Sequence, residues 1–275
     1  MIAQSSASKY NWRRTFRRYW MLCKISFQER MEYRWNILMY MVVVLLPMLV
    51  TMYLWTAVFN SQSNLAATRN IITYYVAAGF LNWRIADFHW IFMLNIKEGR
   101  MANFLLRPMS YPATQFWYEV GGRIWSTILT LPVFGVLILA LGDNFQAPNS
   151  PAGWLLATLA FGFSFVLNFF LTASLGLITV WQNQPEPFFW LYNNVVRWLG
   201  GAMLPLALLP WGLGNWLQWL PFAYIYSLPV RIFQGLPASQ MVQGFGVQLF
   251  WLATAGLMFR FVWRKAVQRY EVFEG

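Results

Sequence analysis

Four ionisable residues lie inside otherwise apolar stretches of this chain, and they form two pairs. Arg84 and Asp87 are three positions apart, whereas Glu119 and Arg123 are four apart with the acid first, so each pair can share one helix face. The pairs stand at similar distances on either side of the segment 96–108. If the two stretches form an antiparallel hairpin, the four charges reach a similar depth, and we predict a cross-helix charge cluster.

This predicted cluster could serve three roles. Charges inside a membrane are unfavourable unless they are paired, and they are often functional. A structural clasp near the cytoplasmic face is the simplest interpretation. Transmission of motion from 96–108 and a direct proton or ion pathway are the alternatives.

The sequence lacks the patterns of common catalytic and metal sites. No G-x-x-x-x-G-K-[ST] pattern occurs, so no ATP site is recognisable, and neither H-E-x-x-H nor C-x-x-C is found. The chain has one histidine, His89, and one cysteine, Cys23, which argues against a multi-ligand zinc site and an internal disulfide. We expect no catalytic residue, metal or cofactor in this chain. His89, beside aromatic residues, is expected to make a hydrogen bond at the membrane interface.

Composition indicates a membrane protein. Hydrophobic residues occupy 59% of the 275 positions and charged residues 11%, against about 25% charged residues in soluble domains. The net charge of +11 would suit nucleic acid, but the charges stand at the ends of apolar stretches rather than on one soluble face. We therefore expect membrane lipids, and not nucleic acid, as partners.

Six apolar stretches are each long enough to cross a bilayer. A hydrocarbon core about 30 Å thick takes about 20 helical residues. We predict an all-α integral membrane protein with a single transmembrane domain over 1–275. The expected transmembrane helices lie at 36–59, 70–95, 114–141, 154–181, 188–210 and 241–262.

Two further segments flank these spans. Residues 8–35 mix basic and apolar residues at helical spacing, which predicts an amphipathic interfacial helix, with a plain anchor before the first span as the alternative. This segment is not expected to be a cleaved signal peptide. Residues 211–240 are apolar but interrupted by Gly and Pro, which predicts a re-entrant or interfacial hairpin between the fifth and sixth spans.

Lysine and arginine set the expected orientation. Eight of them precede the first span and three lie in 96–108, whereas the opposite loops hold Arg69 and Arg231. Because cytoplasmic loops carry the excess of positive charge, both termini, 96–108 and 182–187 are expected to be cytoplasmic. The many aromatic residues are expected to form interfacial belts, with an aromatic cavity for flat or cationic substrates as the alternative.

The order of these elements resembles the permease subunit of type-2 ABC exporters, the group that includes polysaccharide exporters and drug-resistance permeases. The closest resemblance is to a bacterial branch with the loop pattern I-x-x-G-x-[ML]-x-x-x-L-L-R-P. Here the pattern falls on Ile96, Gly99, Met101, Leu105, Leu106, Arg107 and Pro108. A second similar stretch runs from Leu220, Pro221 and Phe222 through Pro229 to Gly235, in the expected re-entrant hairpin.

The resemblance implies a mechanism with several partners. Two permease subunits, a second copy or a dissimilar sister permease, would form the path, and two ABC ATPase subunits would hold ATP and Mg. Segment 96–108 would be the cytoplasmic coupling helix, with a loop that only sets topology as the alternative. Its expected ATPase-coupling residues are Lys97, Glu98, Arg100, Met101, Phe104, Leu105 and Arg107, which offer charges and an apolar ridge.

The resemblance also implies the function and the location. The chain would be a multi-pass permease of the bacterial cytoplasmic (inner) membrane that exports a hydrophobic, cationic or lipid-like substrate. A secondary transporter or a non-transporting membrane scaffold is the alternative, although no internal repeat supports the former. A membrane-embedded enzyme is disfavoured because the chain has only nine acidic residues and no acid-rich motif.

Overall fold

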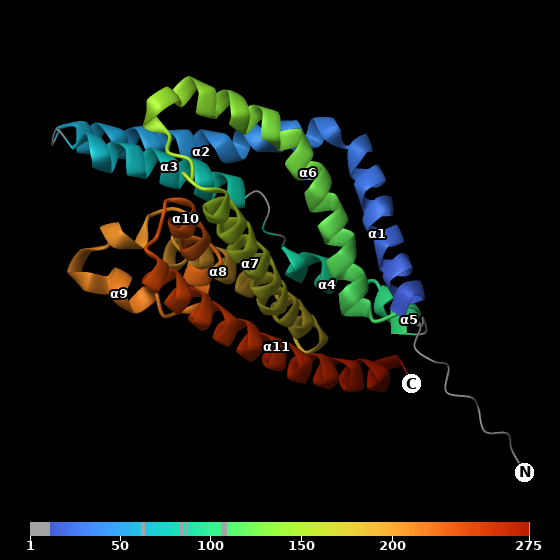
Figure 1. Cartoon of the computed structure of the whole chain (residues 1–275). Coiled ribbons are helices and arrows are strands. Elements are labelled where there is room, and N and C mark those ends of the chain that lie inside the picture. Colours follow the sequence, from blue (N-terminus) through green and yellow to red (C-terminus); the bar gives the residue numbers. More distant parts are fainter. Residues whose placement is uncertain (1–11, 62–63, 83–84, 86, 106–108, 275) are drawn as a thin grey trace, which may run out of the picture.

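The structure is a computed structural model of the chain, and it describes residues 12–61, 64–82, 85, 87–105 and 109–274. Every regular element in this described part is a helix (Figure 1). The helices are α1 Trp12–Glu32, α2 Arg34–Ser61, α3 Leu65–Asn82, α4 Phe88–Lys97, α5 Arg100–Leu105, α6 Tyr111–Leu141, α7 Pro151–Leu177, α8 Glu186–Leu199, α9 Leu213–Leu217, α10 Ser227–Phe233 and α11 Ala238–Glu274. Short 3-10 turns lie at Gly142–Asn144, Ile178–Val180, Leu206–Leu208, Pro210–Gly212 and Pro221–Tyr224.

Within the described residues, four helices are long and apolar enough to cross a membrane. They are Arg34–Asn60, Tyr111–Asn144, Pro151–Val180 and Ala238–Tyr270. Their positions coincide with the predicted first, third, fourth and sixth spans. The chain is therefore an all-helical, multi-pass membrane protein.

The other two predicted spans have a different form. The stretch 70–95 is divided between α3, which ends at Asn82, and α4, which begins at Phe88. Helix α8 ends at Leu199, and its 14 residues give a length of about 21 Å, less than the hydrocarbon core. The backbone turns at Gly201, whose φ of +91° is readily adopted only by glycine. The arrangement with six spans stays a prediction.

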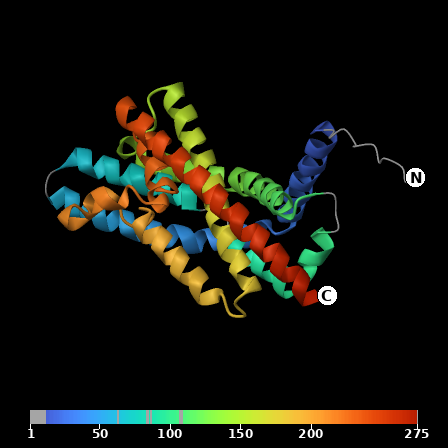
Figure 2. The ribbon, with the colours of Figure 1, turned by 90° about the horizontal axis from the view of Figure 1, so that it is seen from below.

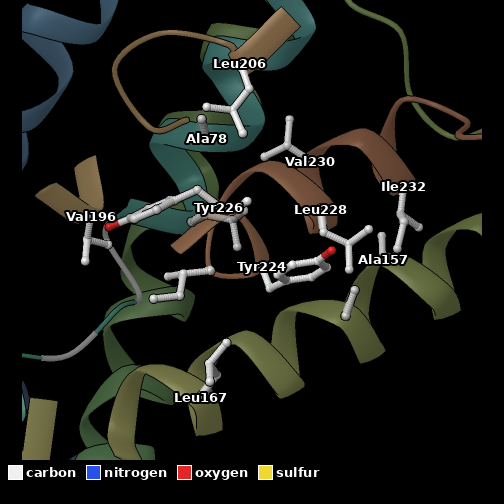
Figure 3. Close-up of a cluster of buried hydrophobic side chains, with 14 of the residues drawn as sticks. Ala78, Ala157, Leu167, Val196, Leu206, Tyr224, Tyr226, Leu228, Val230 and Ile232 are labelled. Carbon is white, nitrogen blue, oxygen red and sulfur yellow. The ribbon is translucent and has the colours of Figure 1, made fainter. Parts of the chain in front are cut away.

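Short helices make up the predicted hairpin 211–240. They include α9, the 3-10 turn at Pro221–Tyr224, and α10, which ends before Gly235 with its φ of +89°. Helix α10 is not on the surface, because most of its side chains are buried against α3 and α7. Figure 3 shows Leu228, Val230 and Ile232 of α10 packed with Ala78 of α3 and Ala157 of α7.

The helices pack in a few close pairs. Helix α1 runs beside the first half of α6, α2 lies along α3, and α7 packs against α4, α10 and α11. Helix α6 bends midway in Figure 1, and Pro132 inside it supplies a cause, because proline removes a hydrogen bond and clashes with the preceding turn. Figures 1 and 2 both show α5 and the end of α11 at one end of the molecule and α9 at the other.

Candidate functional site

Two adjacent glycines let α1 approach α6 closely. A Cβ atom on Gly121 would lie 2.2 Å from the carbonyl oxygen of Cys23, and one on Gly122 would lie 2.1 Å from Nε of Arg30. At this approach the Cys23 thiol donates a hydrogen bond to the carbonyl oxygen of Trp117, with a distance of 2.9 Å. Burial raises the pKa of the Cys23 thiol.

Aromatic rings extend the contact between α1 and α6. Phe16 and Tyr19 both pack on Trp117, and Phe27 lies edge-on to Trp125 with ring centroids 5.0 Å apart. These residues of α1 belong to the apolar face that the sequence predicts. In the structure this face covers a neighbouring helix, which fixes α1 to the segment that follows α5.

The charge cluster forms around Glu119, but with a partner that the sequence reasoning missed. Arg30 of α1 makes an ion pair of 2.7 Å with Glu119 Oε1, and Arg123 Nε lies 3.5 Å from Glu119 Oε2. The side chain of Glu119 is only 4% exposed, so the pairing stabilises a buried charge. Arg84 lies outside the described residues. The available signal for Arg30 was its place on the same face of α1 as Cys23 and Phe27, at helical spacing, although that spacing does not name its partner.

Asp87 joins this region through a polar cavity of about 310 Å³. The cavity is lined by Arg30, Arg123 and Asp87, and by Arg197 of α8, which sequence reasoning also missed. Helices α2, α3 and α7 complete the wall with Asn36, Asn82 and Asn168 among others. The structure therefore brings Asp87, Glu119 and Arg123 into one region, and adds two arginines to it.

The predicted coupling segment is a sharp corner between two helices. Helix α4 ends at Lys97, Gly99 has a φ of +68°, and α5 continues to Leu105. Lys97, Glu98 and Arg100 are exposed, and Glu98 forms an ion pair with Arg100. Arg107 lies outside the described residues.

The apolar side of this corner is turned inward. Met101 is fully buried, and Phe104 packs its ring 5.2 Å from that of Tyr111. In this arrangement Met101 anchors the corner to the rest of the chain. The exposed part is the charged part.

Tyr111 links the corner to two other helices. Its hydroxyl accepts a hydrogen bond of 2.8 Å from Asn95 Nδ2 on α4, and its ring stacks 5.8 Å from that of Trp263 on α11. The residue is buried at the start of α6. A displacement of α5 would therefore reach α4, α6 and α11 through one side chain.

An ion pair fixes the corner to α8. Lys97 Nζ lies 2.7 Å from Glu186 Oε1, so the corner between α4 and α5 and the start of α8 lie at the same end of the molecule. The hydrogen bond from Lys97 holds the pKa of the Glu186 carboxyl below its ordinary value.

A buried glutamine fixes the segment 211–240, the predicted hairpin. Nε2 of Gln248, on α11, donates to the carbonyl oxygens of Ala160 and Tyr224, each at 3.1 Å, and lies 3.2 Å from Ser164 Oγ. Ser164 also donates to the Tyr224 carbonyl. The hairpin residues Pro221 and Phe222 directly precede this contact, and Pro229 is buried in α10. A glutamine in an apolar span was the available signal for this contact.

His89 does not have the predicted environment. It is fully buried, its ring lies 4.6 Å from that of Phe189, and neither ring nitrogen has a hydrogen-bond partner among the described residues. The prediction of an interfacial hydrogen bond is wrong, because aromatic packing between α4 and α8 encloses the imidazole. Within the same described residues, no group of three or more His, Cys, Asp or Glu could hold a metal ion.

Comparison with known proteins identifies the family. No curated protein and no solved structure shows significant similarity to the chain. The family model described as ABC-2 family transporter protein matches residues 66–273, which run from the start of α3 almost to the end of α11 and contain three of the four long apolar helices, all but α2. This family is a membrane transport domain without an ATP-binding site of its own. The chain belongs to the ABC-2 transporter family and is the permease component of an ABC transporter.

Proposed function

We propose that this permease exports its substrate outward across the bacterial cytoplasmic membrane, driven by separate ATPase subunits that bind ATP and Mg. It would pair with a second copy of itself or with a sister permease. The observation that carries this proposal is the corner between α4 and α5. It exposes Lys97, Glu98 and Arg100 at one end of the molecule while Met101 anchors it inside.

This corner suits the transmission of force. A partner that binds the exposed charges would push on a segment whose buried side contacts α6 through Phe104 and Tyr111. Tyr111 in turn contacts α4 and α11. Polar and charged rims with apolar anchors are typical of protein interfaces. Leu105 and Arg107 would complete the contact.

The proposed orientation follows from charge and from the position of the segments. The start of α1, the corner and the end of α11 lie at one end (Figure 2), and these segments carry basic residues, among them Arg17, Arg18, Lys97, Arg100, Arg264 and Lys265. We assign this end to the cytoplasm, in keeping with the excess of positive charge in cytoplasmic loops. The hairpin with Pro221, Phe222, Pro229 and Gly235 then lies toward the outside and would control exit.

The proposed substrate is hydrophobic, cationic or lipid-like. Apolar residues dominate the long helices, and a second cavity of about 270 Å³ between α3, α6, α7 and α10 is almost wholly apolar. Such a surface would suit a substrate that enters from the membrane.

Co-purification in mild detergent tests this function. A tagged chain from its native membrane should retain an ATPase, identified by mass spectrometry, and a variant with Arg100→Glu and Arg107→Glu should lose most of it. Arg69→Glu is the matched control, because Arg69 is exposed near the start of α3, and α3 begins at the end of the molecule opposite α5 (Figure 1). A folded, monodisperse chain that retains no ATPase in any detergent would favour a secondary transporter or a scaffold instead.

A further inference from the structure

The polar cavity beside the charge cluster has an excess of positive charge. Arg30, Arg123 and Arg197 line it, and the carboxylates near them are Asp87 in the wall and Glu119, which is held between Arg30 and Arg123. Arg197 is exposed and forms no ion pair within 4 Å among the described residues. Three guanidinium groups would repel a cationic ligand here, whereas an anionic ligand would neutralise the excess positive charge.

Hydrogen-bond donors add to this charge. The oxygen of the Asn82 side-chain amide accepts a bond of 2.9 Å from the Tyr226 hydroxyl, which turns the amide so that its remaining polar group is the NH₂ donor. Asn36 and Asn193 add further amides to the wall. Arginine and amide donors together match the oxygen atoms of a phosphate group.

The cavity lies at the level of the membrane interface. Asn36 and Ile37 in its wall stand at the start of α2, where the apolar run begins. Trp35 on α2 and Trp198 on α8, which adjoin the wall residues Asn36 and Arg197 in the sequence, are both exposed. Since Trp and Tyr concentrate at the membrane–water interface, this is the depth of lipid headgroups.

The side of the cavity between α2 and α8 allows lateral entry. These two helices do not pack extensively against each other. Within a turn of their wall residues, these helices expose apolar side chains, among them Met39 and Val43 of α2 and Leu191 of α8, which would accommodate acyl chains. The volume of about 310 Å³ is at the lower limit of ligand pockets, about 300 Å³, so it fits a headgroup rather than a whole amphiphile.

We infer that this cavity binds the phosphate headgroup of an anionic lipid, with Arg197 as its main contact and the acyl chains between α2 and α8. The lipid enters from the cytoplasmic leaflet and its phosphate completes the charge balance of the three arginines. That such a lipid represents the transported class rests on the proposed function. Its binding does not, because no ATPase takes part in it.

Native mass spectrometry of the detergent-purified chain tests the binding. After incubation with an equimolar mixture of phosphatidylglycerol and phosphatidylcholine, the chain should retain phosphatidylglycerol preferentially. Arg197→Gln should weaken this retention by about tenfold, as expected for loss of one charged hydrogen-bonding group. Arg197→Lys keeps the positive charge and should retain part of the phosphatidylglycerol binding. This variant therefore distinguishes the loss of charge from a loss of fold.

Controls distinguish the headgroup from general charge attraction. Arg260→Gln removes an exposed arginine from α11, away from the cavity, and should retain phosphatidylglycerol like the unchanged chain. Inorganic phosphate should compete only weakly. Equal retention of the two lipids, equal loss in both glutamine variants, or full displacement by inorganic phosphate would each overturn the inference. If the chain binds phosphatidylglycerol but retains no ATPase, the proposed function fails while the lipid site stands.

Discussion

Arg30 of α1 and Glu119 of α6 form an ion pair of 2.7 Å although 89 positions separate them in the sequence. The Glu119 side chain is 4% exposed and that of Arg30 is 29% exposed, so solvent is almost excluded from the carboxylate on α6 but reaches part of the arginine on α1. The pair joins the N-terminal helix to the helix that directly follows the coupling corner. Its disruption should therefore affect stability and coupling together.

We expect Glu119→Gln to lower the free energy of unfolding by about 1–2 kcal/mol, because the neutral amide leaves Arg30 and Arg123 without their charged partner. Thermal unfolding in detergent would measure the loss. Glu32→Gln is the control, since Glu32 is an exposed acid at the end of the same α1. If both variants unfold at the same temperature as the unchanged chain, the ion pair between Arg30 and Glu119 does not stabilise the fold.

The close approach of α1 to α6 gives a second prediction. Gly121→Ala should separate the helices, since its Cβ would collide with the Cys23 backbone, at a cost of about 1–3 kcal/mol. Cys23 is the single cysteine and is buried beneath this contact. Since maleimide reacts with the thiolate, burial and the raised pKa of Cys23 should keep its labelling slow until α1 moves away.

The rate of maleimide labelling therefore reports docking of α1 without an engineered cysteine. Gly121→Ala should accelerate labelling several-fold. Gly135→Ala, in the same α6, should not, because a Cβ at Gly135 would meet no atom within 4 Å. Equal rates in all three chains would show that α1 does not depend on the glycine pair.

Much of the architecture was predictable from apolar length. In a bilayer, an uninterrupted run of about 20 apolar residues satisfies its backbone hydrogen-bonding groups by forming a helix. The helices α2, α6, α7 and α11 coincide with predicted spans. Apolar length alone does not decide the other two predicted spans, where local breaks interrupt the helix. Gly201 ends the helix that begins at Glu186, and the stretch 70–95 is split between α3 and α4.

The site was less predictable, because it depends on distant pairs. Spacing along one helix identified Glu119 and Arg123, which remain neighbours on α6. It could not show that Arg30 approaches from α1 or that Arg197 approaches from α8, since both depend on tertiary packing. The basic residues of 8–35 were interpreted as orientation signals, and one of them, Arg30, proved to be the ion-pair partner of the buried Glu119.

The buried amide of Gln248 gives a third prediction. Gln248→Leu should destabilise the chain by about 1–3 kcal/mol, because the carbonyl oxygens of Ala160 and Tyr224 lose a donor. The hairpin should also open more readily to proteases near residues 218–226. Gln243→Leu, an exposed change in the same α11, is the control. Similar cleavage of both variants would mean that Gln248 does not hold the hairpin.

The ion pair between Lys97 and Glu186 gives a prediction about pH. Lys97 lowers the pKa of Glu186, so the contribution of this ion pair to stability is complete above the ordinary glutamate pKa of about 4.3. The contribution is lost as pH falls through the lower value of the folded state. Lys97→Gln should return the Glu186 pKa toward its ordinary range.

Carboxyl-¹³C NMR of glutamate-labelled protein in micelles would follow this titration directly. Arg100→Gln is the control, because Arg100 pairs with Glu98 and should leave the Glu186 titration unchanged. The charge reversal Lys97→Glu with Glu186→Lys should restore both the pairing and any ATPase coupling that Lys97→Glu alone removes. Restoration would show that the corner acts through its attachment to α8, whereas failure would place the role of Lys97 in direct contact with a partner.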